Sequence, residues 1–444
     1  MDLFEELQWR GLVYDATEGV RDVLAREKVA GYVGFDPTAA SLHVGNLQVI
    51  MPLARMQRFG HRPIAVVGGG TGLIGDPSGK SVERQLMTSE EVETNLAGIR
   101  AQLERFLDFE SKVAPARLVN NADWLTKLSA VDFMRDVGKH FTVNAMLAKE
   151  SVRRRLESED GITYTEFSYS LLQSYDFLEL YDRFGCTLQM GGSDQWGNIT
   201  SGMDLIRRLR GGKAHGLVLP LITTAAGTKF GKTESGTIWL DPDRTSPYQF
   251  YQFWLNADDQ DAVKYLRFFT FLNAEQIREL EAAGLQEPEK RHPQRALARE
   301  VTGLVHGASA VEEAEGAANL LFANGVSTLT AKQIEQALAG VPTSAIESVS
   351  RGWLVVDLLA SAGITKSKSE AQRLIRGGGL SVNDRRITDE KQRLIIDDAI
   401  EGELFVVRKG KRDYFLIRVV KAPPLKERRQ GVPVDGVDAE TEDP

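Results

Sequence analysis

An imidazole and an amide stand three residues apart at His43 and Asn46, where a helix is expected to begin. The pattern predicts a strand over 30–35, a loop opened by Asp36, and a helix from about 43 to 60. A strand, a glycine-containing loop and a helix N-terminus favour a bound anion, because backbone N–H groups and the helix dipole point toward it. The segment matches neither the phosphate-loop pattern nor the dinucleotide pattern. Taken alone, His43 is best interpreted as a surface residue at a helix start.

A second candidate lies far downstream, where Lys229, Lys232 and Thr233 stand in a polar loop that contains glycine. Most basic loops are simply solvated. Two lysines three residues apart, with a hydroxyl beside them, could instead close over a triphosphate and stabilise leaving pyrophosphate.

These two segments resemble the paired HIGH and KMSKS signatures of class I aminoacyl-tRNA synthetases, in the versions carried by bacterial tyrosyl-tRNA synthetases. Val44 and Asn46 stand in place of Ile and the second His of the generic motif. Phe230, Gly231 and Thr233 stand in place of Met, Ser and Ser, while the first His, the Gly and both Lys are kept. The contribution of Asn46 compared with a second His stays open.

Three charged residues follow a glycine-dense stretch that begins at Gly68. The resemblance implies that Asp76 binds the substrate α-ammonium. It also implies that Lys80 and Arg84, one helical turn apart, form a mobile cationic clamp on a polyphosphate. The alternative is an ordinary Asp-Pro-Ser-Gly turn followed by a solvated charged face.

An aromatic, an amide and a carboxylate share one face of a predicted helix, at Tyr169, Gln173 and Asp176. Such a trio is also what the polar side of a surface helix would present. The resemblance implies that Tyr169 and Gln173 hold the α-amino group, and that Asp176 and Tyr32 bind the substrate phenol hydroxyl. A buried pair of this kind is left unsatisfied by a substrate without the hydroxyl. For tyrosyl enzymes as a class, rejection of phenylalanine is about 10⁴–10⁵, without an editing domain.

Glycines and an acid follow a predicted strand at 186–190, in the order Gly191, Gly192, Ser193 and Asp194. Asp194 could take a pair of ribose hydroxyls, as acidic residues do in other nucleotide folds. The resemblance implies that Gly192 and Asp194 contact ribose and that Gln195 contacts the substrate carboxylate. A plain glycine turn is the alternative.

The resemblance implies a reaction without a protein nucleophile or general base. The tyrosine carboxylate attacks the α-phosphate of ATP, Mg²⁺ arrives with the phosphates, no metal is bound by the protein, and the adenylate passes its acyl group to a tRNA. The implied catalytic residues are Thr38, His43, Asn46, Lys80, Arg84, Lys229, Lys232 and Thr233. The implied ATP contacts are Gly34, Asp36, His43, Gly45, Asn46, Gly192, Asp194, Lys229 and Lys232.

The chain from 351 to 421 carries 15 Lys and Arg against 10 Asp and Glu, although the whole protein has a net charge of −8. A basic module attached to an acidic body indicates a nucleic-acid partner. The segment from Trp353 to Asn383 resembles an S4 RNA-binding domain. The resemblance implies tRNA contacts at Lys366, Lys368, Arg373 and Arg376, with a second basic strip at Arg408, Lys409, Lys411 and Arg412. Arg153, Arg154 and Arg155 are further candidates for the acceptor stem, or surface charge only.

Length and composition limit the number of domains and the kinds of site that the chain can hold. A length of 444 residues, 42% hydrophobic and 26% charged, predicts two or three globular domains. A single cysteine, Cys186, excludes an internal disulfide and a multi-cysteine zinc site, and fits the reducing cytosol. No signal peptide and no apolar run of about 18 residues is visible, so we expect a cytoplasmic protein that does not enter membranes.

Alternating strands and helices predict an α/β, doubly wound, Rossmann-like parallel sheet for residues 1–245, with a helical insertion at about 124–182. An all-helical domain is expected over 246–338 for the anticodon, a linker over 339–350, a small α+β S4-like domain over 351–421, and a disordered acidic tail over 422–444.

The resemblance spans nearly the whole chain and implies a tyrosine-activating synthetase, a homodimer through the insertion, with tRNA(Tyr) bridging the subunits. One competing interpretation is the sister tryptophanyl enzyme, which is not expected to pair Tyr32 with Asp176 or to carry the S4 module. Another is a non-catalytic RNA-binding protein on the same scaffold. The intact lysines of the 229–233 loop count against it.

Overall fold

The computed structural model describes residues 1–75, 88–158, 161–225, 227, 230–233, 236–338, 341–349, 351–410 and 413–420. The chain forms two compact units, one of residues 1–320 with 337–340 and one of residues 321–336 with 341–444. The predicted tail over 422–444 lies outside the described residues.

The first unit is built on a six-stranded sheet with the order β1-β6-β5-β2-β3-β4. All neighbours are parallel except β1, which is antiparallel to β6. The prediction of a purely parallel sheet is therefore wrong at one edge, because a two-residue strand is too short to show a period in the sequence. The strands are β1 (Asp15–Ala16), β2 (Ala30–Phe35), β3 (Arg62–Val67), β4 (Arg117–Asn120), β5 (Cys186–Gly192) and β6 (His215–Leu219).

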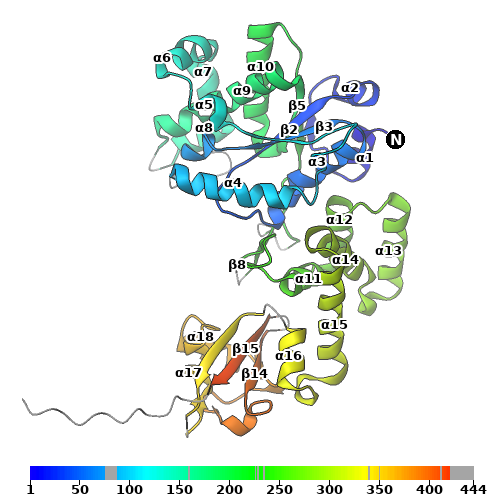
Figure 1. Ribbon diagram of the computed structural model, residues 1–444, viewed down its shortest axis with the longest axis vertical. Helices are drawn as coiled ribbons and strands as arrows, with labels where there is room; N and C mark the ends of the chain where they lie inside the picture. The colour runs from blue at the N-terminus through cyan, green and yellow to red at the C-terminus, as the bar shows by residue number, and fades with distance from the viewer. Residues whose placement is uncertain are drawn as a thin grey trace, which may run out of the picture. The chain divides into compact units, whose positions relative to one another are not determined.

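Helices cover both faces of this sheet, with α3 and α4 on one side and α9 and α10 on the other (Figure 1). Tyr32 on β2 faces α9 and α10 and packs against Phe177. Gly31 faces α3, where an added Cβ would stand 2.7 Å from Met56 Cε. The helices of this part are α1 (Leu3–Trp9), α2 (Val20–Arg26), α3 (Leu47–Arg58), α4 (Ser89–Leu103), α5 (Ala122–Leu125), α6 (Ala130–Asp132), α7 (Val143–Leu147), α8 (Glu150–Leu156), α9 (Tyr164–Phe184) and α10 (Trp196–Arg210).

Strand order reverses between β2 and β5, because the chain runs from β2 through β3 to β4 in one direction and from β5 to β6 in the other. The carboxyl ends of β2 and β5, at Phe35 and Gly192, therefore flank the crevice in which open α/β sheets bind ligands. Helix α9 lies beside this crevice, and local sequence determines where it begins and ends. Thr163 and Glu166 form a capping box at its start, and Gly185 ends it at φ +60°.

Helices continue from residue 247, beyond the short hairpin of β7 (Lys232–Thr233) and β8 (Gly236–Thr237). They are α11 (Pro247–Leu255), α12 (Asp259–Phe269), α13 (Ala274–Gln286), α14 (His292–His306), α15 (Ala308–Asn324) and α16 (Ala331–Ala337). Among the described residues, no helix is both long and apolar enough to cross a membrane.

The second unit contains a five-stranded sheet with the order β12-β11-β14-β15-β9. Its strands are β9 (Thr343–Glu347), β11 (Leu380–Val382), β12 (Arg385–Arg386), β14 (Leu404–Lys409) and β15 (Asp413–Val420). β10 (Trp353–Leu354) pairs with β13 (Arg393–Leu394), and the helices are α17 (Val355–Ser361) and α18 (Lys368–Arg376). The predicted linker is thus wrong over 343–347, because small polar residues with one apolar neighbour also suit an edge strand, and β9 pairs with β15.

Candidate functional site

A buried phenol and a buried carboxylate meet behind β2. Tyr32 is 2% exposed, and its hydroxyl has no hydrogen-bond partner among the residues that the structure describes. Asp176 of α9 accepts hydrogen bonds from Asn121 Nδ2 at 2.9 Å and from Trp124 Nε1 at 2.7 Å. Burial raises the pKa of Asp176 to about 7, against the opposing effect of those two hydrogen bonds. Burial and the nearby Asp176 charge raise the pKa of Tyr32 well above its usual value. A hydroxyl placed here could satisfy both groups.

The other two residues of the predicted helical trio face neighbouring polar groups. Tyr169 is 5% exposed, and its hydroxyl donates to Asp36 Oδ1 at 3.5 Å. Gln173 Nε2 donates to Gln195 Oε1 at 3.1 Å, and Asn198 Nδ2 donates to Gln173 Oε1 at 3.0 Å. The polar stripe of α9 is therefore turned toward the carboxyl ends of β2 and β5 rather than toward solvent. Asp76, predicted to join this group, lies outside the described residues.

His43 begins a short 3₁₀ turn, Val44–Asn46, rather than the predicted α-helix, which starts at Leu47. Its Nδ1 accepts a hydrogen bond from the backbone N–H of Gly45 at 3.0 Å, and its own N–H donates to Asn46 Oδ1 at 2.9 Å. A Cβ at Gly45 would stand 2.7 Å from the imidazole, so only glycine fits. Because Nδ1 accepts, the neutral ring carries its proton on Nε2, which is then a donor for an anion.

The two sequence motifs are brought together by the segment that follows β8. Val44 N–H donates to Ile238 O at 3.0 Å, and Leu240 N–H donates to Leu42 O at 2.8 Å. A Cβ on Gly231, whose φ is +81°, would stand 2.8 Å from Val44 Cγ2. Gly231 therefore packs on the His43 turn. Lys229 lies outside the described residues, as do Lys80 and Arg84, and no side-chain position is described for Lys232 or Thr233.

Space for a ligand lies over β2 and beside β5. Gly34 is exposed within β2, and no described atom comes within 4 Å of where its Cβ would stand. Thr38 is exposed in the loop that follows. At the end of β5, a Cβ on Gly192 would stand 2.5 Å from Asp194 Oδ1. Glycine at 34 leaves the backbone open to close approach by a flat or anionic group, whereas glycine at 192 makes room for the Asp194 carboxylate.

Comparison with known proteins identifies the family of the chain. Residues 24–323 match the family of class I tRNA synthetases for W and Y, and residues 333–417 match the tyrosine–tRNA ligase SYY-like C-terminal domain. The tyrosine–tRNA ligase of Roseiflexus castenholzii is 54% identical over 421 residues, which cover 94% of this chain and 99% of that protein. The tyrosine–tRNA ligase of Geobacillus stearothermophilus is 53% identical, over 94% of this chain and its own full length. This chain belongs to the bacterial tyrosine–tRNA ligase family.

A solved member of this family has the same fold over most of the chain. The C-terminally truncated mitochondrial tyrosyl-tRNA synthetase of Aspergillus nidulans superposes with a TM-score of 0.66 at 31% identity. The match covers 72% of this chain and 94% of that structure.

Three residues with polar groups around Tyr32 and Asp176 were missed from sequence. Asn121 and Trp124 hold Asp176, and Asn121 Oδ1 also accepts from the backbone N–H of Gly70 at 2.7 Å. Asn121 directly follows β4, at the sheet edge where ligands bind, which was a usable signal. Gln189 pairs in register with Tyr32, is 2% exposed, and its Oε1 has no partner among the described residues. A glutamine inside an apolar strand was the signal there.

The predicted tRNA contacts differ in whether their side chains are exposed or buried. Arg155 is 2% exposed and donates to buried Glu166, so it is not available for RNA, whereas Arg153 and Arg154 are exposed. The buried partner explains the correction, since three consecutive residues of a helix point in directions about 100° apart and Arg155 is the one turned toward Glu166.

In the second unit, four of the predicted contacts are exposed: Lys366, Lys368, Arg373 and Arg376. Lys368 pairs with Asp357, Arg376 with Glu390 and Lys409 with Glu370. Arg408 donates to Ser381, while Lys411 and Arg412 lie outside the described residues. β12 adds exposed Arg385 and Arg386, which sequence reasoning did not select.

Proposed function

We propose that this protein activates L-tyrosine with ATP to form tyrosyl-adenylate and pyrophosphate, and then transfers tyrosine to the 3′-terminal ribose of tRNA(Tyr). The observation that carries the proposal is the buried Tyr32 hydroxyl, unpartnered among the described residues, beside the buried Asp176 carboxylate. A phenol hydroxyl from the substrate satisfies both groups: it donates to Asp176 and accepts from Tyr32. Phenylalanine leaves the buried Tyr32 hydroxyl unsatisfied and gives Asp176 no donor beyond Asn121 and Trp124, which is the physical basis for its rejection.

We propose that the rest of the amino acid lies along α9 toward the end of β5. Tyr169 and Gln173, with Asp76, hold the α-ammonium group, and Gln195 holds the carboxylate. The hydrogen bonds among Gln173, Gln195 and Asn198 support this assignment, because they fix the amides before substrate arrives. The carboxylate then lies between the tyrosine pocket and the nucleotide.

We propose that ATP lies over Gly34 and Gly192, with Asp194 on its ribose. His43 Nε2 donates to a phosphate oxygen, and Asn46 and Thr38 lie beside it. Lys80, Arg84, Lys229, Lys232 and Thr233 neutralise the charge on leaving pyrophosphate. Asp36, Gly45 and the Mg²⁺ that ATP carries complete the assignment, and we assign no metal bound by the protein. Packing of Gly231 on Val44 supports the assignment, since it brings the lysine loop to the imidazole.

We propose that residues 1–245 form a doubly wound Rossmann-like catalytic domain, 246–338 an anticodon-binding domain and 351–421 an S4-like RNA-binding domain. Arg153, Arg154, Lys366, Lys368, Arg373, Arg376, Arg408 and Lys411 then contact tRNA, and Arg385 and Arg386 join them. Exposed guanidinium groups on β12 support this extension. Charging tRNA with ATP also supports a cytoplasmic location.

We further propose a homodimer through the helical insertion, with tRNA bridging the subunits. Apolar side chains are exposed together on this segment, which supports an interface. They are Val131, Met134, Val143, Leu147, Leu156 and Tyr164. Val131→Asp combined with Met134→Asp should halve the molar mass measured by light scattering. An unchanged mass would contradict this interface, and Val113→Asp, also exposed but outside the insertion, is the matched control.

ATP–pyrophosphate exchange, with each natural amino acid in turn and without tRNA, tests the function. Exchange is expected with tyrosine and essentially none with phenylalanine. Exchange with tryptophan instead would move the assignment to the sister activity, and no exchange with any amino acid would leave a protein that only binds RNA.

A further inference from the structure

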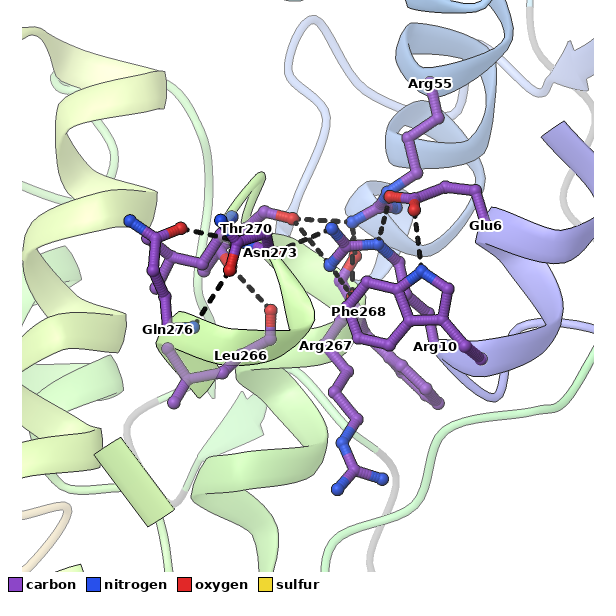
Figure 2. A network of polar contacts seen from close by, with 11 residues as sticks. Glu6, Arg10, Arg55, Leu266, Arg267, Phe268, Thr270, Asn273 and Gln276 are labelled. Carbon is purple, nitrogen blue, oxygen red and sulfur yellow. Dashed lines mark hydrogen bonds and ion pairs between the residues drawn. The ribbon is translucent and has the colours of Figure 1, made fainter. Parts of the chain in front are cut away.

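Two buried arginines close the C-terminal end of α12, as Figure 2 shows. Arg55 of α3 donates through Nη2 to Arg267 O at 3.2 Å, Phe268 O at 3.0 Å and Thr270 O at 2.7 Å. Arg10, which follows α1, donates to Arg267 O at 2.9 Å, Thr270 O at 3.3 Å and Leu272 O at 2.7 Å. The last carbonyls of a helix lack partners within the helix and carry the negative end of its dipole, so the guanidinium groups satisfy them and the charges attract.

The cluster holds more positive than negative charge in a dry environment. Arg10 is 2% and Arg55 1% exposed, and one buried carboxylate, Glu6, accepts from Arg10 Nε at 2.6 Å. Glu6 Oε1 stands 4.0 Å from Arg55 Nε, and Arg55 Nε and Nη1 have no hydrogen-bond partner within the described part of the chain. Arg55 therefore makes its hydrogen bonds to the end of α12 alone, through a single nitrogen.

The same end of α12 holds the lysine loop. Phe269, the last residue of α12, is fully buried and stacks on Phe230 with ring centroids 5.2 Å apart and planes 10° from parallel. Phe230 also contacts the rings of Trp254 and Tyr265, at 5.8 Å and 5.0 Å. An aromatic side chain buried among four rings fixes the backbone of its own loop, and Phe230 lies two residues before Lys232.

Helix α3 connects Arg55 to the turn that holds His43. It begins at Leu47, directly after the turn that holds His43 and Asn46, and Arg55 stands two turns further along. Pro52 interrupts the backbone hydrogen bonds of α3, but every residue from Ile50 to Met56 is buried, so packing holds the two ends of the helix in a fixed relation. One end of α3 thus presents the imidazole, and its other end contacts the same turn of α12 that holds Phe230.

We propose that Arg55 is a positioning residue for adenylate formation, which rests on the function proposed above. It fixes the end of α12 against α3, and through Phe269 and Phe230 it sets the position of the lysine loop relative to His43. Arg55 touches neither substrate, so its effect should fall on the transition state, where the loop acts, and leave tyrosine binding unchanged.

The test is pre-steady-state formation of tyrosyl-adenylate by Arg55→Met, with tyrosine affinity measured separately by equilibrium dialysis. We expect the rate at saturating substrates to fall about tenfold to a hundredfold, the cost of a small misplacement, while the tyrosine Kd stays within about twofold. Arg55→Lys should restore part of the rate. Arg58→Met is the matched control: Arg58 lies on the same helix, exposed, with its guanidinium 3.4 Å from the Phe271 ring.

A double-mutant cycle with Phe230→Ala distinguishes a link from general damage. If both residues act through α12, the double variant should be no slower than the slower single variant. Three results would overturn the proposal. One is a double variant whose fall in rate is the product of the two single falls, another is an equal fall in rate in Arg58→Met, and the third is a parallel loss of tyrosine affinity in Arg55→Met. Should Arg55→Met not fold, Arg55→Lys with Phe230→Leu completes the same cycle. No exchange by the unaltered protein with any amino acid would overturn this link and the proposed function together, whereas normal exchange with unaffected variants would overturn the link alone.

Discussion

Removing one oxygen from Tyr32 should raise stability and lower selectivity together. In the free protein this hydroxyl is buried without a partner among the described residues. A buried hydroxyl left unsatisfied costs about 1–3 kcal/mol. Tyr32→Phe removes that cost and leaves the ring contact with Phe177, whose centroid is 5.3 Å away. The free energy of unfolding should therefore increase by about 1 kcal/mol or more.

In the complex the same hydroxyl gains a partner, so its loss should weaken tyrosine alone. A hydrogen bond of this kind contributes about 0.5–1.5 kcal/mol net, which corresponds to about a two- to twelvefold fall in kcat/KM for tyrosine. Phenylalanine, which lacks the phenol oxygen, should lose nothing. The ratio of the two kcat/KM values in pyrophosphate exchange then falls by the same factor.

Urea unfolding and pyrophosphate exchange measure the two halves of this prediction. Tyr175→Phe is the matched control, because its hydroxyl is on the same helix as Asp176 but donates to Glu179. The control should leave the tyrosine-to-phenylalanine ratio unchanged. A stability loss of about 1 kcal/mol in Tyr32→Phe would mean that the hydroxyl is satisfied in the free protein, and an unchanged ratio would remove Tyr32 from phenol recognition.

Three further changes follow from the structure. Asp176→Asn should abolish a pH dependence of the free energy of unfolding. Burial raises the pKa of Asp176 to about 7, from near 4 in the unfolded chain. The wild-type carboxyl therefore contributes up to about 4 kcal/mol of stability at low pH, which is lost as pH rises through 7. Urea unfolding at about pH 5 and about pH 8 checks this, and an equal change in the free energy of unfolding between the two pH values in the wild-type protein and in Asp176→Asn would contradict it. Gly45→Ala should slow adenylate formation about tenfold or more, because the new Cβ would stand 2.7 Å from the His43 imidazole and displace it. Gly34→Ala has open space around the new Cβ, so it should leave the stability in urea unchanged and raise the KM for ATP. Arg155→Ala should lower the free energy of unfolding by about 3–5 kcal/mol by stranding its buried carboxylate partner, while Arg153→Ala should change only tRNA charging; equal stability in both variants would refute the assignment.

The fold was predictable where local pattern and packing agree. β2 was predicted at its observed bounds, Ala30–Phe35, because a short apolar run ends at Asp36-Pro37. β1 and β9 were not, since the two residues of β1 beside β6, and the four small or polar residues and one isoleucine of β9 beside β15, are strands only by virtue of their partners. Propensity carries no information about a neighbour that is two hundred residues away.

The site was predictable to the extent that its residues stand in motifs. His43, Tyr169, Gln173 and Asp176 were selected from spacing and resemblance. Tyr169 contacts Asp36 after β2 and Gln173 contacts Gln195 after β5, whereas Asp176 contacts Asn121 after β4 and His43 contacts its own turn. Asn121, Trp124 and Gln189 could not be selected in that way. Asn121 and Trp124 matter because both donate to Asp176, and Gln189 because it is buried beside Tyr32; such neighbours depend on tertiary packing rather than on sequence spacing.

The strand contact between Leu42 and Leu240 has a consequence for synthesis of the protein itself. The His43 turn leaves the ribosome early, but the backbone that holds it, Ile238 to Leu240, is about 200 residues further along. At about 5–20 residues per second, roughly 10–40 s separate the two during translation. The nascent chain can form β2 and α3 in that interval but has no nucleotide site, so ATP should protect the completed chain from proteolysis and leave chains released before Ile238 unprotected.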